Sequence, residues 1–322
     1  MRRLLWAAFF ALALPVHAQS PFTNSLHTAL NSLTNSIDSL QQSVQTRSMT
    51  LRVLTYNINA LPWDDETGKH ERYAQIGVLL DKLRQEDKAP HIITIQEAFH
   101  PRSAELIEES NYPYFRLGAP ANSDAPLNSG LIILSEFPIE SASSIDYEIC
   151  MGWDCWANKG VLHVRVRVPG LPVPIEIYNT HMNANSGNDP VEAGKIREQQ
   201  IAQLHEFIGF TRPAGTPAFF AADFNFKPER PEYDVFAAYP GIANAAEFCM
   251  SGKCSGTDAP EGVWRKYVDH QFFLPGLTPA IRIVPIHVEQ TFDELVGGKP
   301  LSDHLGLETH YRLSWQPASP NS

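Results

Sequence analysis

Side chains able to hydrolyse a phosphate ester stand at the ends of apolar runs along the sequence. They comprise carboxylates, two imidazoles and two amides: Asn57, Glu97, His181, Asp223, Asn225, Asp269, Asp303 and His304. Carboxylate and amide oxygens suit a hard cation such as Mg²⁺. A histidine with a carboxylate partner can activate water. The set therefore indicates metal-assisted hydrolysis of a phosphate ester.

The apolar runs that carry these residues are predicted to be strands, and amphipathic runs between them are predicted to be helices. The expected strands cover 52–57, 91–97, 131–135, 160–168, 175–180, 218–223, 264–273, 281–288 and 305–313, and the expected helices cover 71–86, 103–110 and 190–209. Helices first alternate with strands, and strand pairs without helices follow, which is typical of an α+β domain. We expect two β-sheets packed face to face and flanked by helices, with the polar strand ends gathered at one edge.

The order of the polar residues resembles that of the endonuclease/exonuclease/phosphatase superfamily. The matching motifs are Tyr56-Asn57-Ile58, Gln96-Glu97, Thr180-His181-Met182-Asn183, Asp223-Phe224-Asn225, Val268-Asp269-His270 and Ser302-Asp303-His304. They cover nearly the whole span 51–310, and one departure is Ala222, where the family commonly has glycine. The superfamily includes deoxyribonucleases, apurinic endonucleases, inositol-polyphosphate phosphatases and neutral sphingomyelinases. The resemblance implies a four-layered α/β sandwich with two packed mixed β-sheets.

The resemblance also implies a bound cation. Glu97 would be the main ligand of Mg²⁺, and Asn57 and Asp303 would be further ligands. Mn²⁺ and Co²⁺ are alternatives to Mg²⁺, and both the identity and the number of the ions stay open at this point.

Catalytic roles follow from the same resemblance. His304 would be the general base that deprotonates the attacking water, and Asp269 would orient it and favour its imidazolium. His181 would bind the phosphate and stabilise its developing charge. Asp223 and Asn225 would position water, phosphate or a second cation.

The segment 150–160 bears on the substrate, because it resembles the region of neutral sphingomyelinases that ends in Asn-Lys-Gly. It contains Met151, Trp153, Trp156 and Lys159, for which we expect contact with substrate or membrane. Tryptophan favours the membrane interface, where its ring is buried and its N–H stays wet. The alternative is that these side chains pack under their own loop. The expected reaction is hydrolysis of sphingomyelin to ceramide and phosphocholine. The enzyme is expected to act while bound peripherally to a phospholipid surface.

A secreted endonuclease on the same scaffold is the main alternative. Its best candidates for phosphate contacts are Arg165, Arg167, Lys195 and Arg197. The net charge of −11 and the absence of a Lys/Arg-rich run argue against nucleic acid, since binding to it depends on phosphate neutralisation. A binding module with a decayed site is disfavoured by the intact set of polar residues.

Four cysteines occur as two close pairs, Cys150 with Cys155 and Cys249 with Cys254. Four cysteines allow three pairings, and sequence does not choose among them. We favour the two local disulfides, with a zinc site as the alternative, because export and the spacing both favour disulfides.

The N-terminus reads as a secretory signal over 1–18, with two arginines, a short apolar run and a cleavage site after Ala18. A polar leader with an amphipathic helix (19–48), a catalytic domain (49–316) and a tail (317–322) are expected to follow. The leader has an apolar stripe at Leu26, Leu30, Leu33, Ile37, Leu40 and Val44. A helix docked on the domain, or a partly ordered leader, is favoured over an oligomerising helix. We therefore expect a secreted or periplasmic monomer without a membrane span.

Overall fold

The computed structural model describes residues 28, 30–34, 46–63, 71–185, 187, 189–254, 256–257, 267–277 and 280–316. Residues Arg47–Trp315 form one compact unit, to which the following description refers. The expected signal peptide, the tail and most of the leader lie outside the described residues. Residues 28 and 30–34 of the leader are helical, and Leu30 and Leu33 are exposed there, whereas Arg47 and Ser48 already belong to the first strand of the compact unit. None of the helices that are described has the length and apolar character needed to cross a membrane.

An eight-stranded mixed sheet forms one inner layer of the unit. Its order is β10-β13-β16-β1-β2-β4-β3, and β12 pairs with β13 outside this path. The strands are β1 (Arg47–Ala60), β2 (Ile92–Ala98), β3 (Tyr114–Leu117), β4 (Ile132–Ser135), β10 (Gly256–Thr257), β12 (Gly276–Leu277), β13 (Ala280–Thr291) and β16 (Gly306–Trp315). β1 and β2 are parallel and are connected through helix α2 (Glu71–Gln85), as parallel neighbours require a crossover.

A six-stranded sheet forms the second inner layer, in the order β5-β6-β7-β8-β11-β9. The strands are β5 (Ile139–Asp146), β6 (Gly160–Val166), β7 (Ile175–Thr180), β8 (Ala218–Asp223), β9 (Ala243–Asn244) and β11 (Asp269–Leu274). β7 and β8 are parallel and are connected through helix α4 (Pro190–Thr211), whereas β11 runs antiparallel to β8.

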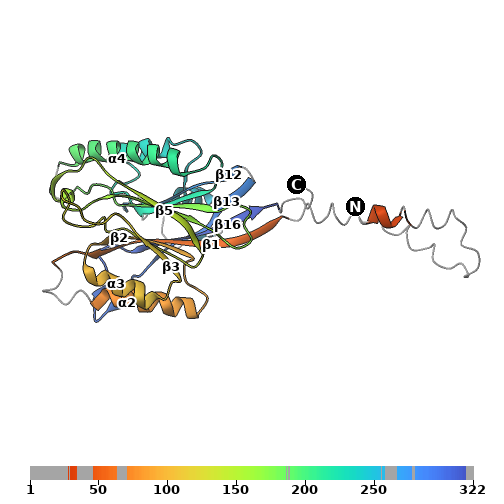
Figure 1. Ribbon diagram of the computed structural model, residues 1–322, viewed down its shortest axis with the longest axis horizontal. Helices are drawn as coiled ribbons and strands as arrows, with labels where there is room; N and C mark the ends of the chain where they lie inside the picture. The colour runs from red at the N-terminus through yellow and green to blue at the C-terminus, as the bar shows by residue number, and fades with distance from the viewer. Residues whose placement is uncertain are drawn as a thin grey trace, which may run out of the picture. The chain divides into compact units, whose positions relative to one another are not determined.

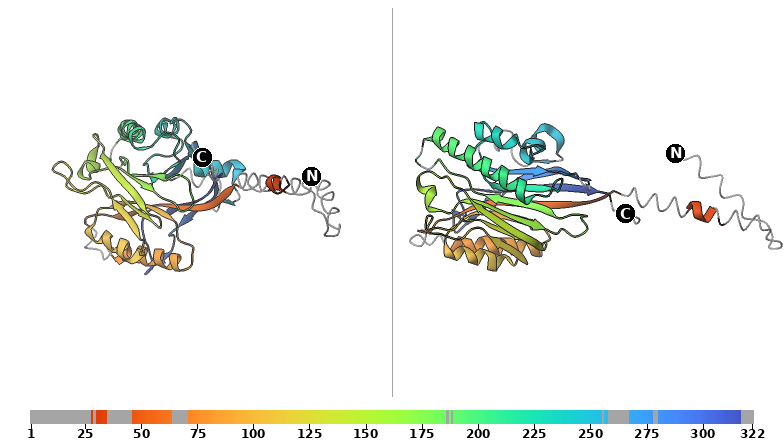
Figure 2. Two further views of the ribbon diagram at one scale, coloured as in Figure 1. Left: turned by 45° about the vertical axis from the view of Figure 1, so that its right-hand side comes forward. Right: turned by 45° about the horizontal axis from the view of Figure 1, so that its top comes forward.

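Helices cover the outer face of each sheet, so the unit has four layers (Figure 1). α2 and α3 (Ala104–Ser110) lie on the first sheet, and α4 lies on the opposite side of the sandwich, as both views of Figure 2 also show. The smaller elements are η2 (Pro101–Ser103), η3 (Gly152–Trp156), α5 (Pro231–Ala237), α6 (Ala245–Phe248), η4 (Cys249–Lys253), β14 (Leu295–Val296) and β15 (Lys299–Pro300). The predicted four-layered α/β sandwich is confirmed.

Three apolar clusters hold the four layers together. One lies between the sheets and contains Val53 of β1 and Ile177 of β7. A second joins the first sheet to α2 through residues such as Ile76 and Leu80. The third joins α4 and α5 to the second sheet. The strands that end in the polar residues singled out from the sequence are thus buried on both faces, which fixes where their polar ends emerge.

Both local disulfides are present. Cys150 pairs with Cys155 and Cys249 pairs with Cys254, so the predicted local pairing is confirmed and the zinc alternative is wrong. The first disulfide closes the loop that contains η3, and with it the tryptophans of segment 150–160. The expected strand 160–168 ends earlier, at Val166, and residues 264–266 of another expected strand lie outside the described residues.

Candidate active site

The polar residues converge where the two sheets meet. Asn57 lies near the end of β1, Glu97 near the end of β2, and His181 directly follows β7. Asp223 ends β8 and is paired with Asp269, the first residue of the antiparallel strand β11. Because neighbouring strands end at this edge from both sheets, side chains far apart in sequence come within hydrogen-bonding distance.

Asn57 connects two of the carboxylates. Its Nδ2 atom donates to Oε1 of Glu97 over 2.9 Å and to Oδ2 of Asp223 over 3.0 Å. Its Oδ1 atom accepts the backbone N–H of Asn59 over 3.0 Å. The fully buried amide therefore holds one carboxylate from each sheet in a fixed position.

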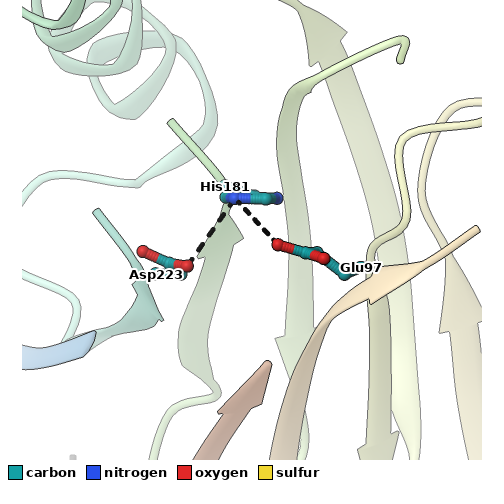
Figure 3. A group of neighbouring side chains, drawn as sticks. All are labelled: Glu97, His181 and Asp223. Carbon is teal, nitrogen blue, oxygen red and sulfur yellow. Dashed lines mark ion pairs between the residues drawn. The ribbon is translucent and has the colours of Figure 1, made fainter. Parts of the chain in front are cut away.

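Glu97 adopts a left-handed backbone conformation, with φ of 57°. A residue other than glycine, asparagine or aspartate rarely adopts this conformation, which costs about 1 kcal/mol or more and is concentrated at functional sites. Its carboxylate lies toward the second sheet, where it meets His181 (Figure 3). Asn225 adopts the same left-handed backbone conformation, with φ of 55°, which asparagine tolerates well.

His181 lies between Glu97 and Asp223, and both carboxylates point toward it (Figure 3). Its Nε2 atom lies 3.7 Å from Oε1 of Glu97 and 3.6 Å from Oδ2 of Asp223. The Nζ atom of Lys159 lies 3.2 Å from the same Nε2 and donates to the carbonyl of Met182 over 3.1 Å. Burial, then Lys159 and His304, lower the pKa of His181 well below its usual range.

His304 and Asp269 form a second group beside the first. The Nδ1 atom of His304 lies 2.8 Å from Oδ2 of Asp269. The backbone N–H of His304 donates to Oγ of Ser302 over 3.2 Å, and this hydroxyl donates to the carbonyl of Asn57 over 2.7 Å. The loop that precedes β16 is thereby attached to β1, so both the position and the orientation of the His304 imidazole are defined.

The site concentrates negative charge in a buried place. Burial raises the pKa of Glu97, and the hydrogen bond from Asn57 opposes the rise. Burial followed by repulsion from Asp269 raises the pKa of Asp223 to about 6. Burial lowers the pKa of His304, but the hydrogen bond and charge of Asp269, with the charges of Asp223 and Asp303, outweigh it and raise the pKa to about 10. A positive charge in this space would relieve the repulsion.

The donor set fits a divalent cation. Ligand atoms of Glu97, His181 and Asp223 all lie within 4.8 Å of one another, and those of Asp223, Asp269 and His304 form a second such group. Oδ1 of Asp269 is buried without a hydrogen-bond partner among the described residues, so it retains an acceptor for water or an ion. The carboxylate oxygens of Glu97 and Asp223 are suitable ligands for Mg²⁺, Mn²⁺ or Co²⁺.

The remaining predicted residues lie around this centre. Asp303 is exposed and lines the same cavity as Glu97. Nδ2 of Asn225 donates to the carbonyl of Met182 over 2.9 Å, and its backbone N–H donates to Oδ1 of Asp223 over 2.9 Å. Asn225 therefore holds the backbone beside His181, and its amide nitrogen is already engaged.

A cavity of about 700 Å³ opens beside these residues. Its polar side is formed by Glu97, His181 and Lys159, and its other walls include Trp153 and Trp156. Both tryptophans are largely exposed, at 70% and 54%, and their ring centroids lie 5.4 Å apart. The alternative that they pack under their loop is therefore wrong.

Met151 does not line this cavity. It is partly exposed, and its backbone N–H donates to Oδ1 of Asn183 over 2.8 Å. The contact with substrate or membrane expected of Met151 stays a prediction.

Three residues of the site were missed by sequence reasoning. Asp154 forms an ion pair with the buried Lys159 and accepts the backbone N–H of Ala184 over 2.9 Å. Trp63 and Phe99 line the cavity beside Glu97. The available signals were that Asp154 lies between two cysteines and that Phe99 lies two residues after Glu97. These positions alone do not reveal the contacts, because the contacts depend on how the loops pack.

Comparison with known proteins agrees with this geometry. The sequence profile of the Endonuclease/Exonuclease/phosphatase family matches residues 54–304. Sphingomyelinase C of Leptospira interrogans is 26% identical over 219 residues, which are 61% of this chain and 38% of that protein. The chain thus spans well under half of that relative's length.

Solved structures share the fold at low sequence identity. A mutant of beta toxin from Staphylococcus aureus with bound magnesium ions superposes with a TM-score of 0.61 at 15% identity. The superposition covers 84% of this chain and 100% of the toxin chain. TDP2 of D. rerio, complexed with a single-strand DNA product, superposes with a TM-score of 0.60 at 16% identity and covers 81% and 98% of the two chains. Fold similarity therefore does not distinguish between substrates.

Proposed function

This chain belongs to the endonuclease/exonuclease/phosphatase family, and from that premise we propose that it is a secreted, Mg²⁺-dependent phosphodiesterase that hydrolyses sphingomyelin to ceramide and phosphocholine. One observation carries the choice of substrate. The cavity that contains Glu97, His181 and Lys159 is walled by the exposed aromatic rings of Trp153 and Trp156. A phosphate site with an aromatic rim suits a headgroup at a lipid surface. The similarity to sphingomyelinase C of Leptospira interrogans supports the same choice.

His304 would act as the base. Because its Nδ1 is held by Asp269, its Nε2 is the nitrogen that can accept a proton from the attacking water. Without a cation, the charges of Asp269, Asp223 and Asp303 raise the pKa of His304 and favour the imidazolium, which cannot act as a base. A cation held beside Asp223 and Asp303 would offset their charge and lower this pKa, so that the neutral imidazole becomes available to accept the proton. Asp269 would thus orient the base and stabilise the product of the proton transfer.

Lys159 and His181 would face the phosphate. The Lys159 ammonium is buried beside Nε2 of His181, and both line the cavity. A positive charge and an imidazole at this place can stabilise the charge that develops on the phosphoryl oxygens. Glu97, with Asp223, Asp303 and Asn57, would hold the cation, which when bound neutralises phosphate charge and assists the leaving alkoxide.

A nuclease is less well supported by the surface charges. The four basic residues that sequence offered for phosphate contacts are all engaged by carboxylates. Arg165 pairs with Glu176, Arg167 with Glu140, Lys195 with Glu192 and Arg197 with Glu232. Each of these four charges is therefore partly offset by a carboxylate, and none of the four residues lines the cavity that contains Lys159, Glu97 and His181.

Release of phosphocholine from sphingomyelin vesicles tests the proposal. The purified protein is assayed with Mg²⁺ and with EDTA, beside a digestion of double-stranded DNA. Lipid cleavage that EDTA abolishes, with DNA left intact, is expected. Cleavage of DNA without cleavage of lipid would move the substrate to nucleic acid and leave the roles of Glu97 and His304 standing.

A further inference from the structure

A further group of histidine and glutamate side chains, of types that can bind a metal ion, lies away from the candidate active site, on β13 and β16. The strands pair antiparallel, with His287 opposite His310 and Glu289 opposite Glu308. Residues two apart in a strand point to the same face, so all four side chains share one face of the first sheet. The quartet of His287, Glu289, Glu308 and His310 is called the β13–β16 cluster below.

The β13–β16 cluster lies on the outer face of the sheet. Val288, between two of its members, belongs to the core between the sheets. Leu54, which pairs with Glu308 across β1, belongs instead to the core beneath α2. The cluster is thus on the side opposite to the inter-sheet core, and its side chains other than Glu308 are partly accessible.

The ligand atoms converge. Nε2 of His310 lies 2.9 Å from Oε1 of Glu308 and 3.3 Å from Oε1 of Glu289, and the three residues offer ligand atoms within 4.8 Å of one another. Ligands bound at 2.0–2.2 Å around a tetrahedral ion lie roughly 3.3–3.6 Å apart. The observed spacing needs only small side-chain movements to reach that value.

Electrostatics also point to a cation. Glu289 and Glu308 stand directly opposite each other, an arrangement of like charges that destabilises a sheet. Glu308 is only 5% exposed, which adds the cost of burying a charge. Within the part of the chain that is described, the ion pairs of both carboxylates are with histidine, and neither involves lysine or arginine.

We propose that Glu289, Glu308 and His310 form a second, structural divalent-metal site, selective for Zn²⁺ or a similar transition metal. His287 would complete it, since its Nε2 already lies 3.6 Å from Oε2 of Glu289 and its ring centroid 5.3 Å from that of His310. Imidazole ligands favour Zn²⁺ over Mg²⁺. The ion would fasten β13 to β16, the strand that begins two residues after His304. The site does not depend on the proposed substrate.

Zinc binding is tested in a chain whose catalytic carboxylates are removed. The first variant, Glu97→Gln/Asp223→Asn, suppresses metal binding at the active site. The second variant carries these two changes together with Glu289→Gln/His310→Gln. After dialysis against Zn²⁺ and removal of free metal, the first variant should retain about one more zinc per chain than the second. Zn²⁺, but not Mg²⁺, should raise the unfolding midpoint of the first variant only, because a ligand stabilises the state that binds it.

Matched replacements away from both sites serve as the control. Glu192→Gln/His205→Gln, in the same background, should leave zinc retention unchanged. Equal zinc retention with and without the Glu289→Gln/His310→Gln changes would overturn the proposal, as would an equal effect of Mg²⁺. If the variant with Glu289→Gln/His310→Gln does not fold, crystals of the unmutated chain soaked in Zn²⁺ are measured at the zinc absorption edge. An anomalous peak between Glu289, Glu308 and His310 supports the site, and the absence of such a peak refutes it.

Discussion

His304 and Asp269 form a hydrogen bond of 2.8 Å that joins the two sheets at the active site. Asp269 begins β11 of the six-stranded sheet, and His304 precedes β16 of the eight-stranded sheet. The pair therefore exists only when the sandwich is assembled. This arrangement makes the dyad the first target for mutation.

Replacement of His304 by alanine should lower kcat by about 10²- to 10⁴-fold, the usual contribution of a general base. The fold should persist, because the imidazole is partly exposed and lies in a loop. Phosphocholine release from vesicles measures the loss, and thermal unfolding checks the fold. His205→Ala, on α4 and outside the site, is the control. Activity of His304→Ala within a few-fold of the unmutated chain would remove His304 from the role of base.

Asp269→Asn should also reduce kcat by about 10²-fold or more while leaving KM within a few-fold. The amide keeps the size of the side chain but no longer stabilises the imidazolium of His304. Combining this change with His304→Ala should cost little more than His304→Ala alone, because the two residues act as one unit. Additive losses in the double variant would show that Asp269 acts independently of His304.

Glu97→Gln should weaken Mg²⁺ binding by at least about tenfold, equivalent to about 1.4 kcal/mol. The change keeps the size of the side chain and removes the charge that faces His181 and Asn57. Isothermal titration of metal-free protein with Mg²⁺ gives the affinity, and EDTA should abolish turnover of the unmutated chain. Glu192→Gln, an exposed carboxylate on α4, should bind Mg²⁺ normally. Unchanged affinity in Glu97→Gln would show that the ion lies elsewhere.

Much of the fold was predictable because the strands that carry the site are apolar on both faces. β7 and β8 are buried at every position. The sequence of β8 is a nearly continuous apolar run, and β7 is marked by the apolar residues Ile175, Ile177 and Tyr178. β5 was missed because it is an edge strand in which Ile139 is buried and Ile145 is partly buried, and most of its other residues are small or polar. β3 was missed because it is an edge strand of only four residues, which is too short for a clear strand pattern.

The site was predictable to the extent that its residues end strands. Asn57, Glu97, His181 and Asp223 follow apolar runs, and the packing of the sheets brings them together. The ion pair of Lys159 with Asp154 was not predictable, because it depends on the path of the loop closed by Cys150 and Cys155. The cavity wall depends on loop packing in the same way.

Burial of His270 should make stability depend on pH. Burial lowers the pKa of His270 to about 4, and the hydrogen bond between its Nε2 and the carbonyl of Phe226 opposes this only in part. The unfolded chain has a histidine pKa of about 6.5, so below that pH it binds a proton that the folded chain does not. The stabilising effect of a neutral His270 is therefore complete above about pH 6.5 and declines as the pH falls toward 4.

His270→Gln isolates this effect, because glutamine can donate to the same carbonyl and does not titrate. Urea unfolding at pH 7 and pH 4.5 gives the change in free energy for each chain. The loss between the two pH values should be smaller in the variant by about 2 kcal/mol. The comparison is made between chains because Asp223, with its raised pKa, acts in the opposite direction in both. Equal losses would mean that His270 is protonated in the folded state.

Removal of the exposed tryptophans should separate lipid binding from chemistry. Trp153 and Trp156 are exposed and line the outer part of the cavity, whereas Glu97 and His181 lie at its polar end. Trp153→Ala/Trp156→Ala should weaken binding to sphingomyelin vesicles by about tenfold or more, since two aromatic rings no longer enter the interface. Hydrolysis of a small soluble phosphodiester should stay within about twofold, because the catalytic groups are unchanged.

Phe210→Ala tests whether any exposed aromatic ring has this effect. Phe210 is 81% exposed and lies near the end of α4, on the outer layer of the sandwich. Its replacement should leave both vesicle binding, measured by sedimentation, and lipid hydrolysis unchanged. A double tryptophan variant that binds vesicles normally but loses hydrolysis of both substrates would assign the rings to the shape of the cavity and not to the membrane. Loss of lipid hydrolysis alone, in step with loss of binding, is the result that places the cavity mouth at the lipid surface.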